Sequence, residues 1–380
     1  IGRKTVETVL DAIEDAGIEV PEDDDAPERT PQDDELADEV IEIIKDQYIF
    51  FRNAWQLWES GIWNEQKSIY RYVKKVLREN RYRGVRISKA RHNSVQFFCE
   101  QELTIEDESV IDDYPQYFNV ENGLFNLDTM QLEPHRKTVY CTAQAGFKYD
   151  AKADCPTFRK WVADMFVHEG TDKPDFDLIN FIQEMMGYCL TADTSHRVSF
   201  WIIGKSGTGK STYVNLLVNM MKSYHKTIDL NQLATNRFLL ATIAGKRLIT
   251  SVEASAGVRL DDGIYKTLVS DDMVLADVKN RDPIEFVPQG KIVWAMNNLP
   301  YVGDRSGAVD SRVKIIPMTR QIPRSEWDLR LDEKLLLELP GIFNFSLEGL
   351  KRLRSQGHFT RVEQSERMSD DYRKMQDIYS

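Results

Sequence analysis

Eight consecutive residues, 204–211, limit what this chain can fold into more than any other part of it. They read G-x-x-x-x-G-K-S, a glycine-rich spacing that holds phosphates between a strand and a helix. The largely apolar segment 198–203 precedes them, as expected of a strand buried on both faces. Apolar residues then recur at helical spacing: Val214, Leu217, Val218 and Met221. Strand, loop and helix in this order predict a site for a nucleoside triphosphate.

The motif also predicts what its residues do. Glycines let backbone N–H groups point toward a phosphate at a helix N-terminus, whose partial positive charge favours anions. Lys210 is expected to reach the β- and γ-phosphates, and the hydroxyl of Ser211 to bind Mg²⁺. A glycine-rich turn that matches by chance is the alternative, and the flanking segments argue against it. The expected ATP and Mg²⁺ site comprises Gly204, Lys205, Ser206, Gly207, Thr208, Gly209, Lys210, Ser211 and Thr212.

Two later strands end in polar residues that can complete such a site. Glu253 follows the apolar run 248–252, and Asn297 follows the run 292–296. A lone acid at a strand end often only caps or solvates the strand. Ligands of open α/β sheets, however, bind at the carboxyl edge of parallel strands, which favours function here. We expect Glu253 to hold the metal and Asn297 to contact the γ-phosphate or orient the attacking water.

The order of segments predicts an α/β fold with a central, mainly parallel sheet. Hairpins are expected around residues 48–58 and 117–134, and a helical segment from Phe158 to about Leu190. Five parts are expected: an N-terminal helix and acidic linker (1–45), a mixed α/β region (46–150), a helical collar (151–195), the ATPase core (196–320) and a C-terminal helical region (321–380).

The net charge of −12 does not exclude a nucleic-acid partner. Residues 19–39 carry −10 of it, which leaves −2 for the rest of the chain. This acidic, proline-containing run is typical of a linker. Residues 71–91, in contrast, hold nine basic side chains and one acid, Glu79. They predict either a phosphate-contacting patch or an ordinary solvated helix face, and the sequence favours neither.

The four cysteines, Cys99, Cys141, Cys155 and Cys189, are scattered without metal-ligand spacing. Apolar runs are too short to cross a membrane, and the N-terminus does not resemble a signal peptide. We therefore expect reduced thiols, a cytoplasmic location and no membrane partner. Because the sequence begins at Ile1 rather than Met, we also expect it to be a fragment of a longer polypeptide.

Five further strings give the chain a family resemblance. "LITSVE" (248–253) and "VWAMNNLP" (293–300) follow the phosphate loop at intervals of some forty residues. Together they resemble the superfamily 3 helicases, which are AAA+ ATPases of small viruses, phages and plasmids. Three of the strings resemble segments around the ATPase of the poxvirus D5-like and phage P4-like primase-helicases: "YFNVENGLFNLDTMQLEPH", "NFIQEMMGYCL" and "ELPGIFNFSLEGLKRL". The resemblance covers roughly residues 115–355.

The resemblance implies further roles. Glu253 takes the Walker B position, and Asn297 the sensor position. Arg312 falls where the family places an arginine that reaches a neighbouring subunit's ATP; a strand-edge salt bridge is the alternative. Sites shared between subunits imply a homo-oligomeric ring, expected to be a hexamer. Ser255 stands where family members often carry a second acid, so Asp261, Asp262 or Glu253 itself is left to activate water, or hydrolysis is slow.

The family also places a hairpin between Glu253 and Asn297 that grips single-stranded DNA in the ring's channel. Segments 274–278 and 284–287 predict its strands, with the DNA-contacting tip at Lys279, Asn280 and Arg281. Lys266 matches another basic position of the family. An ordinary solvated turn is the alternative, because Asp277 and Asp282 nearly cancel the two basic charges.

The resulting hypothesis is an ATP-dependent DNA helicase module that acts in phage or plasmid DNA replication, in the host cytoplasm if viral. An upstream primase-polymerase, as in a deep-sea vent phage, is the expected fusion partner. Two alternatives stay open. One is a nucleotide-binding ring that only assembles a fused primase, and the other is an initiator or loader ATPase.

Overall fold

The computed structural model describes residues 29–229, 232, 236–251, 259–260, 262–279, 282–302 and 309–378 of the chain. Contacts divide the chain into two compact units. The first comprises Ile1–Leu57 and Asn64–Glu108, and the second comprises Trp58–Trp63 and Ser109–Ser380. The expected N-terminal helix, within residues 1–17, lies outside the described residues.

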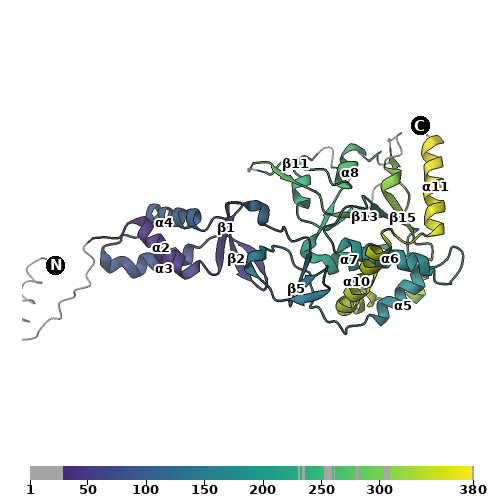
Figure 1. Ribbon diagram of the computed structural model, residues 1–380, viewed down its shortest axis with the longest axis horizontal. Helices are drawn as coiled ribbons and strands as arrows, with labels where there is room; N and C mark the ends of the chain where they lie inside the picture. Colours follow the sequence, from purple (N-terminus) through teal and green to yellow (C-terminus); the bar gives the residue numbers. More distant parts are fainter. Residues whose placement is uncertain are drawn as a thin grey trace, which may run out of the picture. The chain divides into compact units, whose positions relative to one another are not determined.

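The first unit packs three helices around one apolar core (Figure 1). Residues three and four apart, such as Leu36 and Val40, give each helix a buried stripe. The expected hairpin is present, because Arg52 and Asn53 both adopt positive φ, at 51° and 55°, as a two-residue turn requires. The elements up to residue 108 are α2 (Asp33–Ile44), β1 (Tyr48–Phe51), β2 (Ala54–Glu59), β3 (Ile62–Gln66), α3 (Tyr70–Glu79), the 3₁₀ turn η1 (Asn80–Arg83) and α4 (Lys89–Glu102). Strands β2 and β3 each have residues in both units, because Trp58–Trp63 belongs to the second.

The second unit begins with a three-stranded antiparallel sheet, of which the expected hairpin at 117–134 is a part. It consists of β4 (Tyr117–Val120), β5 (Gly123–Asn126) and β6 (Gln131–Glu133).

The helical segment expected from Phe158 to about Leu190 was wrong in its middle. Two helices are present, α5 (Pro156–Met165) and α6 (Phe176–Cys189). Gly170 lies between them with φ of 71°, and Pro174 cannot donate a helical hydrogen bond. Asp175 then starts α6, because its carboxylate accepts the backbone N–H of Leu178 at 3.1 Å.

A five-stranded parallel sheet, as the sequence predicts, forms the centre of the second unit, in the order β15-β7-β13-β9-β8. Side chains of β7 alternate between two cores: Phe200 and Ile202 pack with α6 and α7, and Trp201 with α8 on the other face (Figure 1). The elements are β7 (Ser199–Ile203), α7 (Lys210–Met221), β8 (His225–Ile228), β9 (Leu248–Ser251), β10 (Arg259–Leu260), α8 (Asp262–Leu268), β11 (Val274–Ala276), β12 (Ile284–Phe286), β13 (Lys291–Met296), β14 (Tyr301–Val302) and β15 (Val313–Pro317).

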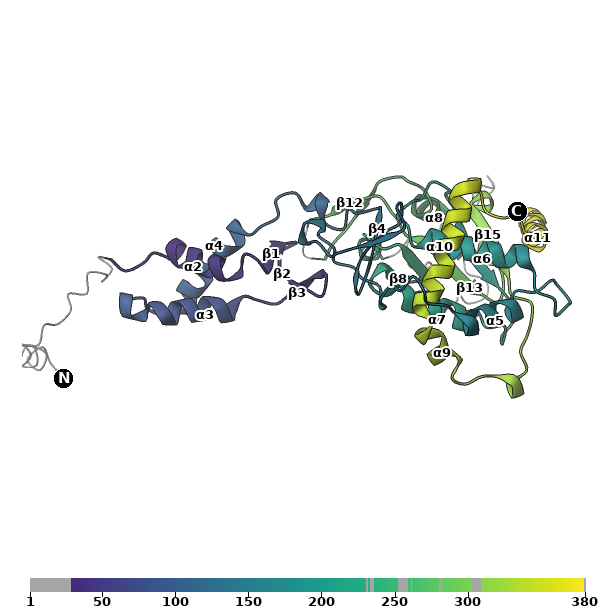
Figure 2. The same cartoon turned by 60° about the horizontal axis from the view of Figure 1, so that its bottom comes forward.

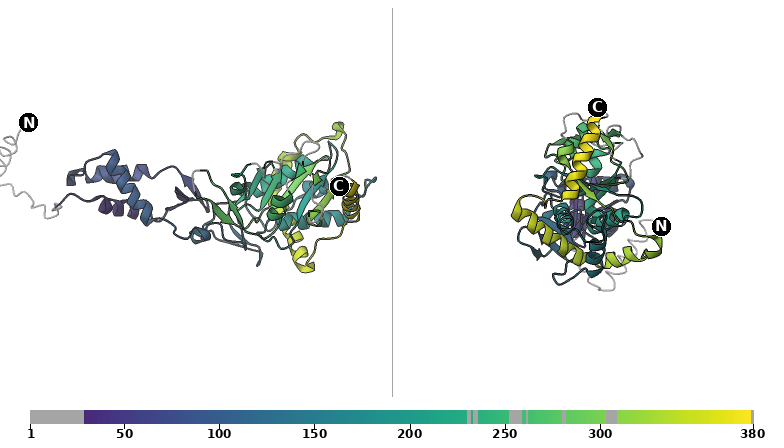
Figure 3. Two further views of the ribbon diagram at one scale, coloured as in Figure 1. Left: turned by 90° about the horizontal axis from the view of Figure 1, so that it is seen from above. Right: turned by 90° about the vertical axis from the view of Figure 1, so that its right-hand side faces the viewer.

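Three helices close the chain: α9 (Leu331–Leu337), α10 (Leu339–Gln356) and α11 (Glu363–Ile378). Helix α11 packs along β15, the edge strand, and faces the viewer in the right-hand view of Figure 3. Helix α10 lies beside α6 (Figure 2). The two helices can approach closely because residue 349 is glycine. A Cβ at this position would lie 2.0 Å from the carbonyl oxygen of Gln183.

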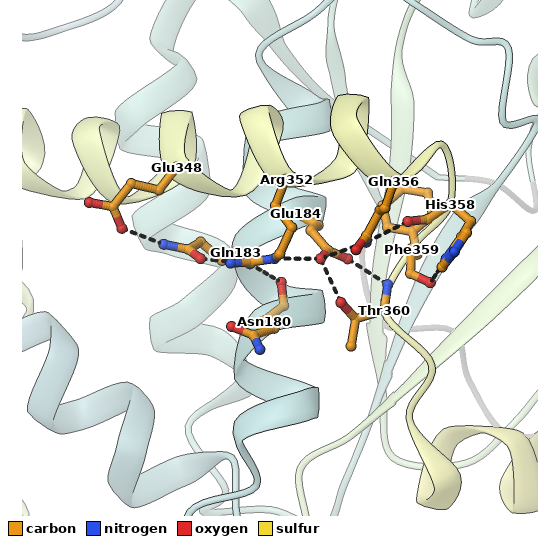
Figure 4. Close-up of polar contacts among 9 residues, drawn as sticks. All are labelled: Asn180, Gln183, Glu184, Glu348, Arg352, Gln356, His358, Phe359 and Thr360. Atoms are coloured by element: carbon orange, nitrogen blue, oxygen red, sulfur yellow. Dashed lines mark hydrogen bonds and ion pairs between the residues drawn. The ribbon is translucent and has the colours of Figure 1, made fainter.

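A buried carboxylate joins α6 to α10 and the segment after it (Figure 4). Glu184 is fully buried and accepts from Arg352 Nε at 2.7 Å and Gln356 Nε2 at 3.0 Å. It also accepts the backbone N–H of Thr360 at 2.7 Å. The buried charge is thereby paired and hydrogen-bonded. Helices α6 and α10 and strand β7 share one core.

Candidate nucleotide-binding site

The glycine-rich loop links β7 to α7 as its sequence predicts. Strand β7 is buried throughout, and α7 starts at Lys210. Gly207 and Gly209 both have φ of 82°, which side chains with a Cβ rarely adopt. A Cβ at Gly204 would lie 2.2 Å from the carbonyl oxygen of Met318, so this loop needs glycine for space as well as for conformation.

Lys210 is nearly buried, at 9% exposure, and its ammonium group faces the loop. It donates to the carbonyl oxygens of Gly204 at 2.6 Å and Lys205 at 2.9 Å. A third bond, of 2.9 Å, reaches Oδ1 of Asn297. The structure therefore brings together two residues that the sequence places 87 positions apart. A cation held by loop carbonyls is positioned for an anion that enters the same loop.

The carboxyl ends of three neighbouring strands meet at this point, since β13 lies between β7 and β9. Ser251 ends β9, Asn297 follows β13 and the phosphate loop follows β7. They line one pocket of about 890 Å³, within the usual range for small-molecule sites. Ser206, Gly207, Thr208, Gly209, Ser211 and Thr212 line it as well. Their glycine cradle and hydroxyl groups fit a triphosphate with Mg²⁺.

The outer wall of the pocket consists of residues that the sequence did not predict. Thr157, Lys160, Trp161 and Asp164 of α5 line one side, and segment 322–334 lines another. The backbone N–H of Ile322 donates to the carbonyl of Gly207 at 3.2 Å, and Gln321 Nε2 donates to that of Ser206 at 2.8 Å. These residues carry no local motif, because they approach the loop only through tertiary packing.

Arg312 lies at the amino ends of the parallel strands, whereas the pocket lies at their carboxyl ends. It directly precedes β15, which runs parallel to β7 with Val313 opposite Ser199. Its own backbone carbonyl accepts from Ser199 Oγ at 3.2 Å. The phosphate loop begins at the other end of β7, a strand length of about 16 Å away for five residues. A strand's length therefore separates the Arg312 backbone from the phosphate loop of its own chain.

A hairpin is present where the sequence predicts one, formed by β11 and β12, which pair antiparallel with Val274 opposite Phe286. Lys279 is exposed beyond β11, and Asp277 near it pairs with Arg237 at 3.6 Å. Lys266 lies on α8. Asn280 and Arg281 lie outside the described residues, as do Glu253, Ser255 and Asp261.

Two buried cations occupy the amino edge of the same sheet. Lys291, which begins β13, donates to the carbonyl oxygens of Thr191 at 2.5 Å and Gln289 at 3.0 Å. Arg247 donates to the carbonyl of Leu190 at 2.6 Å. Both cations thus satisfy carbonyls at the C-terminal end of α6, which attracts positive charge. Burial lowers the pKa of Lys291 to about 7.

Metal-ligating clusters and reactive cysteines were also sought in the part of the chain that the structure describes. No group of three or more His, Cys, Asp or Glu side chains could hold a metal there. The four cysteines are buried free thiols, and burial raises the pKa of each to about 12, so none is an activated nucleophile. Among the same residues, no helix is both long and apolar enough to cross a bilayer.

Two family models match parts of the chain. Residues 33–167 match the family described as "D5 N terminal like". Residues 202–312, from β7 to Arg312, match a "Family of unknown function (DUF5906)". Each match covers less than half of the chain.

Known proteins extend the comparison. "Putative helicase L207/L206" of Acanthamoeba polyphaga mimivirus is 25% identical over 228 residues, which are 57% of this chain and 23% of that protein. The chain thus spans about a quarter of this relative's length. "The A form apo structure of NrS-1 C terminal region-CTR" has a TM-score of 0.53 at 13% identity, and covers 87% of this chain and 74% of its own. "The apo structure of NrS-1 C terminal region (305-718)" has the same TM-score at 15% identity, with 86% and 72% covered. At such identities the likeness concerns the fold alone. Together the matches support the expected resemblance to D5-like primase-helicases.

Proposed function

We propose that this chain is an ATP-dependent DNA helicase module of the superfamily 3 AAA+ type, acting in viral DNA replication. The observation that carries the proposal is the contact between Lys210 Nζ and Asn297 Oδ1, at 2.9 Å beside the pocket. A phosphate-loop lysine and a sensor amide meet there at the carboxyl edge of a parallel sheet. The name of the mimivirus relative and the match to the D5-like family add support for a helicase.

In this proposal ATP is the substrate and lies in the glycine-rich loop. Lys210 and the backbone N–H groups at the start of α7 hold its phosphates, and Asn297 senses the γ-phosphate or orients the attacking water. Ser211 and Glu253 hold Mg²⁺, which neutralises phosphate charge when bound.

The position of Arg312 supports a site that two subunits share. Because its backbone lies about 16 Å from the loop that follows β7, we assign its guanidinium to a neighbouring subunit's phosphates. Head-to-tail contacts of this kind close into rings, and we propose a hexamer. The β11–β12 hairpin, with Lys279 beyond its first strand, would contact single-stranded DNA in the channel.

Complementation between two inactive variants tests the shared site. Lys210→Ala and Arg312→Ala should each reduce DNA-stimulated ATP turnover by about 10²-fold or more. Mixed before assembly, they should recover activity, because some interfaces then combine an intact Lys210 with an intact Arg312. Failure to recover, or full activity of Arg312→Ala alone, would contradict catalysis in trans.

Strand displacement on forked DNA tests the motor itself. Unwinding that needs ATP and intact Lys210 supports the helicase. Turnover no higher than that of Lys210→Ala would favour the ring that only assembles a fused primase. Binding to duplex origins without strand displacement would favour an initiator or loader.

A further inference from the structure

The basic segment 71–91, in the first unit, contains two groups of cations, which differ in whether the fold supplies them with a partner. Arg83 pairs with Glu39 at 3.0 Å, Arg91 with Asp33 at 2.7 Å, and Lys75 with Glu79 at 3.9 Å. Arg71 donates to the hydroxyl groups of Tyr48 at 3.2 Å and Tyr72 at 2.8 Å. These four cations have partners that account for their positions. Five cations have no acidic partner among the residues that the structure describes: Lys74, Arg78, Arg81, Arg86 and Lys89. Of these, Lys74 lies 5.5 Å from the centre of the Tyr70 ring.

The cations without an acidic partner are close together in the sequence, and three of them share a stripe of α3 and η1. Lys74, Arg78 and Arg81 follow the helical spacing i, i+4, i+7 from α3 into η1. Val73 and Leu77, each one residue before a cation of this stripe, are buried in the core, so the stripe runs beside the buried face of α3. Arg86 and Lys89 follow within the next eight residues, in the loop and at the start of α4. Five positive charges without an acidic partner in so short a stretch raise the local concentration of anions.

An aromatic ring lies among these charges. The side chain of Tyr82 is 81% exposed, between Arg81 and Arg83 in η1. Gly84 follows with φ of 82° and ends the turn. Exposing a tyrosine ring to this extent has no benefit for packing. Cations that track phosphates and an exposed ring on which a base stacks are the two parts of a single-strand binding surface.

We propose that Lys74, Arg78, Arg81, Tyr82, Arg86 and Lys89, the Tyr82 surface, bind single-stranded nucleic acid. A single strand fits better than a duplex, because only an unpaired base offers its face to the ring. This site lies in the first unit and does not depend on ATP. It is therefore separate from the channel contacts of the proposed motor and can exist if that motor does not.

Binding of a 20-mer of deoxythymidine, without nucleotide and in a Lys279→Ala background, tests the charges. The triple variant Arg78→Gln, Arg81→Gln, Arg86→Gln should bind at least ten-fold more weakly at low salt. The slope of log K against log salt should fall by about 2, since each single-strand phosphate contact contributes about 0.7. The matched control removes three exposed lysines of the second unit, Lys148→Gln, Lys152→Gln and Lys173→Gln. Equal weakening by both triples would overturn the proposal.

An abasic oligonucleotide of the same length measures binding without base stacking, and so separates the contribution of the Tyr82 ring from that of the charges. Tyr82→Ala should weaken binding of the thymidine oligomer roughly five-fold or more and leave the abasic oligomer unchanged. Photo-cross-linking with 5-iododeoxyuridine should attach DNA to a peptide that contains Tyr82. Unchanged thymidine binding, or equal losses for both oligomers, would overturn a stacking role. Circular dichroism spectra that match the wild type exclude misfolding as the cause of a loss.

Discussion

Strand β13 has a buried lysine network at each end, and the two differ in their acceptors. At its carboxyl end, Lys210 donates to the phosphate loop and to Asn297 beside a large pocket. At its amino end, Lys291 donates to carbonyls that end α6 or lie in its own loop, and its ammonium lies 4.8 Å from the centre of the Tyr188 ring. A ligand phosphate can replace the loop carbonyls around Lys210. The backbone carbonyls at Lys291 are fixed parts of the fold, so we propose a catalytic role for Lys210 and a structural role for Lys291.

Lys210→Ala should have the largest effect on activity. We expect ATP turnover to fall by about 10²–10³-fold, because the variant lacks the ammonium group that stabilises negative charge on the phosphates in the transition state. The melting temperature should change little, since the loop carbonyls can bind water in the open pocket. Lys222→Ala, an exposed lysine just after the same helix, is the matched control. Comparable turnover of the two variants would reject the assignment.

Lys291→Met should change the pH dependence of stability instead. The pKa of Lys291 in the folded protein, about 7, lies below its ordinary value of 10.5 because of burial. Between these values the unfolded chain binds more protons, so the wild-type free energy of unfolding rises with pH from about 7 to 10.5. We expect a gain of about 2–4 kcal/mol over the variant across that window, measured by urea unfolding. Lys314 is an exposed lysine of β15. The free energy of unfolding of Lys314→Met should therefore depend on pH as that of the wild type does.

Asn297→Ala tests the link between the two strand ends at the pocket. We expect a smaller loss of ATP turnover than for Lys210→Ala, about 10- to 100-fold, because the lysine stays in place without its amide partner. Binding of ATP should weaken less than turnover. If binding and turnover fell by the same factor, Asn297 would only hold the substrate.

His225→Gln should have the smallest effect. Burial, together with the charges of Lys246 and Lys226, lowers the pKa of His225 to about 4, below its ordinary value of 6.5. Its neutral ring is 2.7 Å from the hydroxyl of Thr250 on β9. Wild-type stability is therefore lost as pH falls from 6.5 to 4, by about 1–2 kcal/mol after solvent screening. The variant should lose less over that range, as thermal melting at several pH values would reveal.

Local sequence patterns predicted the parts of the fold that repeat over short distances. The phosphate loop and the parallel strands follow from periodicity and glycine spacing. The hairpin at 274–287 was expected from the family resemblance, and its two strands are present as β11 and β12. The break between α5 and α6 was also readable in principle, from Gly170 and Pro174 followed by a capping Asp175. The apolar pattern on both sides concealed it.

Long-range contacts were beyond the sequence. Nothing near Lys291 distinguishes it from a surface lysine, because its acceptor Thr191 is 100 residues away. The spacing of apolar residues around Trp161 indicates a buried core position. The structure shows that this side chain also lines the pocket, together with segment 322–334. The contact of Lys210 with Asn297 was expected only in so far as both follow strands that end at one edge.

The pairing of Glu184 with Arg352 and Thr360 has a practical consequence for dissecting this protein. The partners of this carboxylate are 168 and 176 residues away in the sequence. A recombinant ATPase that stops near residue 320 would leave an ionised group without its counter-charge against an uncovered helix. Such a truncation is expected to aggregate or to need detergent, whatever its nucleotide affinity. Expression trials that aim at an autonomous motor should therefore retain α10 and Thr360.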